Sequence, residues 1–200
     1  METVLGLDEQ QSEPSVETPE PSEKQPNPQA EKSQPPKKGG GGWDANEMLK
    51  QHFEQPVRFV TYTGLKDLSV VRTKPYTVWG KDANGETIKM PKLHVLFAFP
   101  KEKMPDLKPH IKVRTPLKTE NLQPIKSRED RYHVDDELLE QVRDNKFNVN
   151  IVTRAGYVLN GWLQQFDKYV LYMRIGEKMV IVYRHGLYAF TVEEQPKDTP

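Results

Sequence analysis

Short runs of alternating hydrophobic and polar residues fill the last third of the chain. The runs are rich in β-branched and aromatic residues and are separated by turn signals, which is typical of strands joined in tight antiparallel hairpins. Gly161 lies inside one run and predicts a bend where a partner strand approaches closely. Five strands are predicted, near residues 148–155, 157–166, 169–174, 178–183 and 187–192.

A short helix is predicted directly before these strands. Asp135 is a typical capping residue, and Val134 and Leu139 have the spacing of a hydrophobic staple. The buried stripe of the helix is expected to consist of Leu138, Leu139 and Val142. A helix followed by five tightly connected, bent antiparallel strands indicates a small barrel.

The middle third repeats parts of this pattern. Asp44 is expected to cap a short helix that carries Met48, Leu49 and Phe53, and Asn84-Gly85 is a hairpin signal. Residues 100–131 are interrupted by Pro and are expected to cross irregularly, with one strand near 111–114. Further strands are predicted near residues 57–63, 68–73, 76–79 and 93–99.

Two pairs of segments indicate an internal duplication. Residues 56–64 align with 148–156, and residues 92–99 align with 178–185. We therefore predict two related barrels in tandem, the first of them degenerate. The alternative is that β-rich segments resemble one another by composition alone.

A net charge of zero conceals a segregation along the chain. Residues 1–42 carry 4 basic and 8 acidic side chains, residues 43–132 carry 17 and 11, and residues 133–200 carry 8 and 10. A cationic middle third permits binding to nucleic acid without requiring it. Residues 1–42 contain too few large hydrophobic residues to fold, so they are interpreted as a disordered, solubilising linker. The alternative is that their acidic residues compete with RNA for the basic region.

The sequence contains no motif typical of metal binding, of catalysis or of membrane insertion. The chain has no Cys and its five His show no metal-ligand spacing, so neither a metal nor a cofactor is expected. No P-loop, Gly-x-Ser-x-Gly or kinase pattern occurs, and we expect a protein that is not an enzyme. No hydrophobic run is long enough for a membrane span and the first residues do not resemble a secretory signal, so no membrane partner and a cytoplasmic location are expected.

Three motifs, in order after the predicted helix, resemble the Hfq branch of the Sm-like family. Residues 154–161 (RAGYVLNG) match its first turn and bent second strand, and residues 165–171 (QFDKYVL) are similar to its Ser-Phe-Asp-Gln-Phe segment. Residues 182–186 (VYRHG) are similar to its Tyr-Lys-His-Ala motif. The resemblance covers residues 134–193.

This resemblance implies a mostly β fold with two small Sm-like (SH3-like) five-stranded bent barrels, each preceded by a short helix, after a disordered N-terminal tail. The implied domains are a disordered acidic tail rich in Pro and Gly at 1–42, a degenerate basic Sm-like domain at 43–131, an Hfq-like Sm domain at 132–194 and a disordered tail at 195–200.

The resemblance also implies a bacterial RNA chaperone of post-transcriptional regulation, which binds single-stranded uridine-rich RNA at the pore face of a homo-oligomeric ring. By this resemblance Tyr169 stacks on a base, Lys168 stands where the family has Gln, and Tyr183 belongs to the pore motif. Arg184 replaces the family's Lys, and His185 is retained. Stacking contributes about 1–3 kcal/mol per base and Arg is a planar, charged donor, so the set suits single-stranded RNA.

Other candidate RNA-binding residues lie outside the pore motif. Arg143 and Lys146 correspond to the family's basic rim, here interrupted by Asp144, so a weaker RNA-annealing surface is expected. Arg154 and Tyr157 correspond to the opposite face, which in the family binds adenine-rich RNA. In the middle repeat, Phe97-Ala98-Phe99 takes the place of Tyr183-Arg184-His185, so no polar pocket is expected there.

Structural roles are the alternative for several of these residues. Tyr183 can be a core aromatic and His185 a strand-end residue in solvent. The basic stretch from Lys101 to Arg131 is either a phosphate clamp or a solvated surface. Trp79 and Trp162 are interpreted as packing residues. The alternative function is a Sm-fold scaffold for protein interactions with little RNA affinity.

A ring is the expected assembly, because a lone Sm-like barrel leaves its fourth and fifth strands unpaired at the edges. Three chains of two barrels each satisfy this requirement. Six chains that pair only through the last third satisfy it as well.

Overall fold

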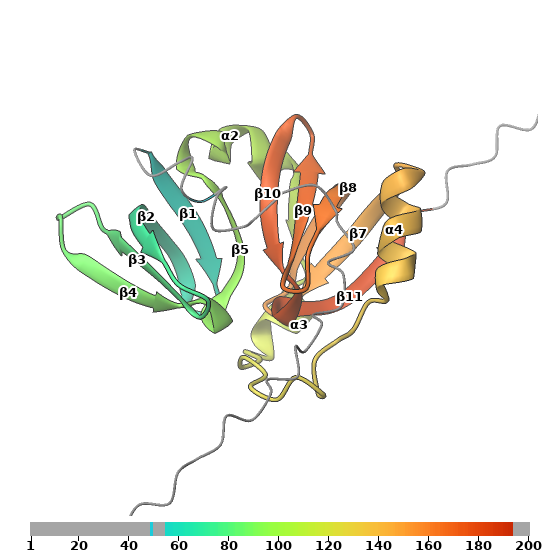
Figure 1. Cartoon of the computed structure of the whole chain (residues 1–200), viewed down its shortest axis with the longest axis horizontal. Helices are drawn as coiled ribbons and strands as arrows, with labels where there is room; N and C mark the ends of the chain where they lie inside the picture. Colours follow the sequence, from blue (N-terminus) through green and yellow to red (C-terminus); the bar gives the residue numbers. More distant parts are fainter. Residues whose placement is uncertain (1–48, 50–54, 194–200) are drawn as a thin grey trace, which may run out of the picture. The chain divides into compact units, whose positions relative to one another are not determined.

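The computed structural model describes residue 49 and residues 55–193 (Figure 1). The tails predicted at 1–42 and 195–200 lie outside the described residues, as does the helix predicted near 44–53 except for Leu49, which is helical and buried. No helix in the described part of the chain is long and apolar enough to cross a membrane.

The described residues are mostly β, as predicted, and all strand pairs are antiparallel. The strands are β1 (Pro56–Thr61), β2 (Gly64–Thr73), β3 (Thr77–Lys81), β4 (Thr87–Pro91), β5 (Val95–Pro100), β6 (Ile111–Val113), β7 (Asn148–Thr153), β8 (Tyr157–Phe166), β9 (Val170–Ile175), β10 (Lys178–Tyr183) and β11 (Leu187–Val192). The helices are α2 (Met104–Leu107), α3 (Thr115–Thr119) and α4 (Asp136–Asp144), with 3₁₀ turns η1 (Lys92–His94), η2 (Lys101–Lys103), η3 (Lys108–His110) and η4 (Arg184–Gly186).

Local sequence signals located most of these elements correctly. The five strands predicted in the last third coincide with β7 to β11 to within two residues at each end. Asn84-Gly85 joins β3 to β4, and Gly85 has the positive φ of 81° that favours glycine in a tight turn. The strand expected near 111–114 is β6, which pairs with β8. The short helices α2 and α3 were not predicted.

The strand order contains the same connection pattern twice. It runs β11-β7-β8-β9-β10-β5-β1-β2-β3-β4, so the fifth strand of each group of five lies beside the first strand of that group. We call β1–β5 the first strand set and β7–β11 the second strand set. They join where Phe97 and Ala98 of β5 pair with Val182 and Ile181 of β10. Figure 1 shows β5 and β10 adjacent between the two sets.

A shift of 92 residues relates the two strand sets. It connects the first residues of β1, η1 and β5 with those of β7, η4 and β11, namely Pro56 with Asn148, Lys92 with Arg184 and Val95 with Leu187. The predicted alignment of 56–64 with 148–156 follows this shift. The predicted alignment of 92–99 with 178–185 is wrong, because β5 is the last strand of its set and not the fourth. Hydrophobic strands of similar composition can be aligned in several registers. The turns between the strands define the correct alignment.

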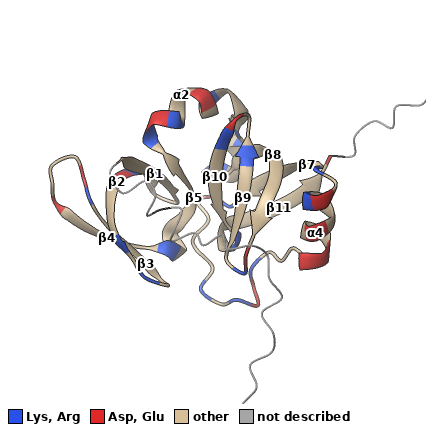
Figure 2. Ribbon diagram, turned by 45° about the horizontal axis from the view of Figure 1, so that its top comes forward, with Lys and Arg blue, Asp and Glu red and all other residues tan. Residues whose placement is uncertain are grey.

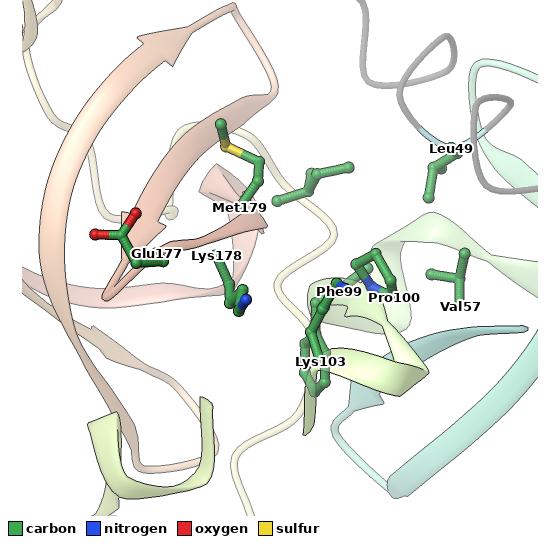
Figure 3. A pocket seen from close by; sticks show the side chains of 10 residues that line it. Leu49, Val57, Phe99, Pro100, Lys103, Glu177, Lys178 and Met179 are labelled. Atoms are coloured by element: carbon green, nitrogen blue, oxygen red, sulfur yellow. The ribbon is translucent and has the colours of Figure 1, made fainter. Parts of the chain in front are cut away.

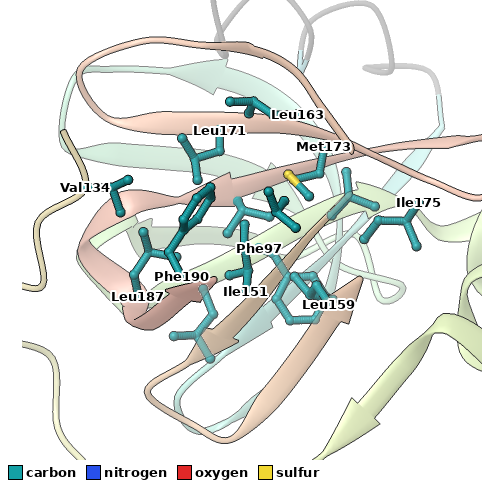
Figure 4. Packing of buried hydrophobic residues seen from close by; sticks show 14 of the residues in the cluster. Phe97, Val134, Ile151, Leu159, Leu163, Leu171, Met173, Ile175, Leu187 and Phe190 are labelled. Atoms are coloured by element: carbon teal, nitrogen blue, oxygen red, sulfur yellow. The ribbon is translucent and has the colours of Figure 1, made fainter. Parts of the chain in front are cut away.

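Buried hydrophobic residues form two clusters on opposite faces of β9 and β10. Because side chains alternate along a strand, Leu171 and Val182 belong to one cluster, which consists mainly of residues of the second strand set and also includes Phe97 and Phe99 of β5 (Figure 4). Tyr172 and Ile181 belong to the cluster that joins the two sets, together with Phe59 and other residues of the first set. The joint between the strand sets is therefore a hydrophobic core, in which each fully buried large side chain contributes about 1.5–3 kcal/mol.

Helix α4 packs on the second strand set through part of its predicted stripe. Val134 and Leu139 are both buried in the first cluster, as a hydrophobic staple requires, and so is Val142. Leu138 is 38% exposed, so its assignment to the buried stripe is wrong. Leu138 directly precedes Leu139, so its side chain is rotated by about 100° around the helix axis from the side that faces the core.

Gly161 confirms the expected close approach in β8. A Cβ added at this position would overlap the carbonyl oxygen of Arg174 in β9. The missing side chain therefore lets β9 lie close against β8 where the strand bends.

Candidate functional site

Turn η4 brings five of the predicted site residues together. Lys168 and Tyr169 lie in the turn between β8 and β9, Tyr183 ends β10, and Arg184 and His185 begin η4. The Arg184 backbone N–H donates to the carbonyl oxygen of Tyr169 over 2.9 Å, which places the two turns side by side.

Tyr169 presents its ring to solvent on a well-ordered turn. The side chain is 57% exposed. The Asp167 carboxylate accepts hydrogen bonds from the backbone N–H groups of Tyr169 and Val170, at 2.6 and 2.9 Å, and so holds the turn in shape. The Lys168 ammonium lies 6.0 Å from the centre of the Tyr169 ring. This pair combines an open aromatic face with a nearby positive charge, the two groups that bind a base and its phosphate.

Arg184 is already occupied by protein groups. Its Nη1 donates to Oδ1 of Asp136 at 2.9 Å and to the carbonyl oxygen of Asp167 at 3.1 Å, and its Nη2 donates to the carbonyl oxygen of Val134 at 2.7 Å. Only 12% of the side chain is exposed. Arg184 therefore ties the start of α4 to the turn that carries Tyr169.

His185 faces the joint between the strand sets. Its Nε2 lies 2.9 Å from the carbonyl oxygen of Val95, the first residue of β5. Burial lowers the pKa of His185 to about 4, despite the hydrogen bond to Val95, and the positive charge of Arg131 acts in the same direction. The ring is thus neutral at pH 7 and donates from Nε2 to Val95. The alternative of a strand-end residue in solvent is wrong, because β5 covers the ring.

Tyr183 is a core residue of the same joint. It is buried, and its ring centre lies 5.5 Å from that of His185. Its hydroxyl has no hydrogen-bond partner among the described residues, and burial raises the pKa of this hydroxyl above the ordinary value. The geometry matches the structural alternative of a core aromatic, apart from the unpartnered hydroxyl.

The predicted rim residues lie at the far end of α4. Arg143 donates from Nε to Asp144 at 2.9 Å and lies 5.7 Å from the centre of the Phe166 ring, while Lys146 is exposed. The charged positions of α4 are mostly acidic (Figure 2), with Asp136, Glu137, Glu140 and Asp144 against Arg143. A helix surface of this charge attracts phosphate less than a basic rim does.

Arg154 and Tyr157 lie beside a turn that the crossing segment covers. Arg114 donates its backbone N–H to the carbonyl oxygen of Gly156 at 2.7 Å, and Val113 of β6 pairs with Tyr157. The Tyr157 ring is half-buried, edge-on to Phe97 at 5.5 Å. Arg154 donates to the carbonyl oxygen of Gln123 at 3.3 Å. Both candidates therefore have packing partners in residues 97–123.

The two tryptophans differ in their surroundings. Trp79 is half-buried, with Arg72 and Lys89 over its ring. Trp162 is 41% exposed, and the Arg174 guanidinium lies 5.7 Å from the centre of its ring, so Trp162 packs against Arg174 at the surface and not in the core. Trp162 lies on the outer face of β8, where the strand alternation points side chains away from the core.

A cavity of about 240 Å³ lies between β1, β5 and β10 (Figure 3). Its walls are mainly hydrophobic, from residues such as Val57, Phe99 and Ile181, and charged side chains occur at Lys103, Glu177 and Lys178. The aromatic side chain in this lining, Phe99, is buried, so the cavity lacks an exposed ring like that of Tyr169. It is not a second version of that site.

Comparison with known proteins places the η4 region in a family. The model of the family described as Hfq protein matches residues 134–197. The RNA-binding protein Hfq of Natranaerobius thermophilus is 33% identical over 55 residues, which are 28% of this chain and 66% of that protein. Residues 134–197 form an Hfq-family domain. The RNA-binding protein Hfq of a Geobacillus species is 26% identical over 62 residues, 31% of this chain and 84% of that protein.

A crystal structure of the pleiotropic translational regulator Hfq is 28% identical to the chain. It covers 28% of this chain and 95% of that chain, with a TM-score of 0.28. The Hfq-family domain contains η4 and all nine residues that the sequence singled out. The first strand set lies outside the matched residues.

Sequence reasoning missed several groups that shape this region. Asp136 and the carbonyl of Val95 bind Arg184 and His185, and no local pattern identifies them as partners. Tyr76 in the first strand set, which is 73% exposed, was also missed. The 92-residue shift pairs Tyr169 with Thr77, one position away from Tyr76, so the backbone hydrogen bonds of the two turns were needed to find it.

Proposed function

We propose that this protein binds single-stranded, uridine-rich RNA through its Hfq-family domain and acts in the cytoplasm as an RNA chaperone in post-transcriptional regulation, without enzymatic activity. The observation that carries the proposal is the exposed ring of Tyr169, with Lys168 beside it, on a turn that Asp167 holds in place. Base stacking on an exposed aromatic is tolerant of sequence and contributes about 1–3 kcal/mol per base.

The roles of the other pore-motif residues follow from their partners. Arg184 positions the Tyr169 turn and does not offer a free guanidinium to phosphate. His185 is neutral and directed at Val95. RNA affinity then depends mainly on stacking at Tyr169 and on the charge of Lys168, which makes it sensitive to salt.

Two Sm-like folds in tandem and a ring of three chains complete the proposal. The edge of β10 is already paired with β5, so six chains joined only through the last third would have to separate these strands. The outer strands of the order are β4 and β11, which correspond to β10 and β5 under the internal repeat. Pairing β4 of one copy with β11 of the next repeats the β5–β10 joint, and such head-to-tail contacts between identical copies close into rings.

Fluorescence anisotropy of a labelled uridine-rich RNA at low and high salt tests the RNA-binding proposal. Tyr169→Ala is expected to weaken binding about 5- to 100-fold, since it removes one stacking platform. Trp162→Ala is the matched control, because it removes an aromatic ring that is 41% exposed on β8, and it is expected to bind like the unaltered protein. RNA affinity of the Tyr169 variant equal to that of the unaltered protein, or a loss of affinity in the Trp162 variant alone, would contradict an RNA-binding site at η4.

A scaffold for protein interactions is the second candidate function. The observation in its favour is that Arg184 and His185, which the resemblance directs at RNA, are both bonded within the chain. Absence of RNA binding by the unaltered protein at low salt would favour this candidate.

A further inference from the structure

The turn between β2 and β3 has the same construction as the turn that carries Tyr169. Lys74 N–H donates to the carbonyl oxygen of Thr77 at 2.8 Å, and Asp167 N–H donates to that of Val170 at 2.9 Å. In both four-residue turns the third residue is a tyrosine, Tyr76 or Tyr169. Tyr76 is 73% exposed, more than the 57% of Tyr169.

The neighbouring turns repeat as well. Lys92 N–H donates to the carbonyl oxygen of Tyr76 at 2.9 Å, as Arg184 N–H does to that of Tyr169 at 2.9 Å. On the other side of η1, Tyr62 N–H donates to His94, just as Arg154 N–H donates to Gly186 beside η4. The backbone around Tyr76 therefore has the same hydrogen-bond pattern as the backbone around Tyr169.

The side chains around Tyr76 are more basic than those around Tyr169. Lys74 opens the turn where the second strand set has Asp167, and Lys92 opens η1 where the second set has Arg184. Residues 74–77 and 92–94 contain no carboxylate, whereas the corresponding region of the second set includes Asp167. The predicted comparison of Phe97-Ala98-Phe99 with the pore motif is out of register. The 92-residue shift sets Pro91-Lys92-Leu93 against Tyr183-Arg184-His185, so Lys92 is the one polar side chain at these three positions.

We propose that Tyr76 and Lys74 form a second nucleotide-binding site for single-stranded RNA, in which a base stacks on Tyr76 and the exposed Lys74 attracts its phosphate. The proposal extends the proposed function, since it assumes the same class of ligand. The two sites lie near one joint: η1 leads directly into β5, whose first residue Val95 accepts the hydrogen bond from His185 of η4. On this proposal, an RNA strand long enough to span the two turns contacts both tyrosines.

Photocrosslinking with an oligouridylate that contains 4-thiouridine tests this site directly. Trypsin releases residues 73–81, which include Tyr76 because the Lys74-Pro75 bond resists cleavage, and residues 169–174, which begin with Tyr169. Both peptides are expected to carry crosslinked RNA in the unaltered protein. Tyr76→Ala is expected to remove the crosslink on 73–81 and to keep that on 169–174, while Tyr76→Phe, which retains a stacking ring, keeps both.

Affinity measurements give an independent readout of the same site. Tyr76→Ala is expected to weaken binding of an oligouridylate of about 16 nucleotides by about tenfold and to change binding of one of about four nucleotides much less, because only the longer strand reaches both turns. Val71→Ala, at a 57% exposed position on β2, is the control and is expected to bind like the unaltered protein.

The outcomes separate this inference from the proposed function. Crosslinks on 169–174 without any on 73–81 would overturn the second site and leave the first intact. Crosslinks on 73–81 alone would support the second site and remove the first. Absence of both RNA binding and crosslinks would overturn the two together.

Discussion

Tyr169 and His185 lie at the same pair of turns, yet the fold gives them opposite environments. Tyr169 projects into solvent, while His185 is directed across the joint at the carbonyl oxygen of Val95. The difference arises because β5 covers the side of η4 that carries His185 and leaves the β8–β9 turn open. A histidine that the motif associates with RNA therefore holds the two strand sets together.

The environment of His185 predicts a pH dependence of stability. Its pKa of about 4 in the folded protein lies below the value of about 6.5 for an unfolded chain, so protons bind the unfolded state more tightly. This contribution is fully present above about pH 6.5 and is lost as the pH falls through about 4. Between about pH 7.5 and 4.5 we expect the unaltered protein to lose roughly 2 kcal/mol more unfolding free energy than His185→Gln, measured by urea denaturation.

His185→Gln is also the internal control, since carboxylates such as Asp67 titrate equally in both proteins. The Arg58 guanidinium holds the pKa of Asp67 below its usual value, so its contribution is also lost in acid. Identical pH profiles for the two proteins would contradict the buried, neutral state of His185.

At the scale of elements, the Arg184 side chain connects η4, the start of α4 and the β8–β9 turn. Arg184 in η4 donates to Asp136 at the start of α4, to Val134 just before it and to Asp167 in the β8–β9 turn. The stacking residue thus stands on a turn whose position depends on the docking of a helix. Strand β6 and helix α3 belong to the segment that connects the first strand set to α4. They cover the β7–β8 turn, so this connecting segment packs on the second strand set.

Arg184→Ala is expected to lower the free energy of unfolding by about 2–3 kcal/mol, because the buried carbonyl of Val134 and the half-buried carbonyl of Asp167 lose a charged donor, while the exposed Asp136 contributes little. Arg184→Lys keeps the charge but not the planar fork, so an intermediate loss is expected. Urea denaturation followed by circular dichroism measures both. Lys146→Ala, which removes an exposed cation after the end of α4, should stay within about 0.5 kcal/mol of the unaltered protein. A loss no greater for Arg184→Ala than for this control would show that Arg184 does not tie these elements together.

At the scale of the whole molecule, the joint between β5 and β10 determines which edges remain open. It uses the fourth strand of the second set and the fifth strand of the first, and it leaves β4 and β11 at the ends of the strand order. β4 is the fourth strand of its set, as β10 is, and β11 is the fifth strand of its set, as β5 is. Edge strands favour pairing with another chain. On β11 the Tyr132 hydroxyl accepts a hydrogen bond from the backbone N–H of Phe190 at 3.2 Å and donates one to its C=O at 3.4 Å, so a β4–β11 contact at this position requires Tyr132 to move.

Light scattering coupled to size-exclusion chromatography measures the resulting assembly. Three copies of the 23.2 kDa chain correspond to a mass of about 70 kDa, which is the expected result because three β4–β11 contacts leave no open edge. A mass of about 140 kDa would indicate six chains, and a mass near 23 kDa at all concentrations would contradict assembly through these edges. The measurement at high salt should agree, since strand pairing does not depend on charge.

The sequence by itself determined the features that depend on neighbouring residues. The limits of β7 to β11, the helix with Val134 and Leu139, the close approach at Gly161 and the Hfq-like motifs all follow from residues a few positions apart. The predicted cap did not form, because the Asp135 side chain makes no capping hydrogen bond in α4. The family resemblance singled out Tyr169, and the structure places this residue on an exposed turn.

Only the tertiary structure decided which distant groups meet. The pairing of β5 with β10, the burial of His185 against Val95 and the capture of Arg184 by Asp136 and Val134 join residues about 50 to 90 positions apart. The register of the internal repeat was decided in the same way, since hydrophobic strands such as 95–99 fit several alignments by composition and strand pairing selects one. Hydrophobic burial is non-directional, so a sequence pattern shows that a strand is covered without showing what covers it.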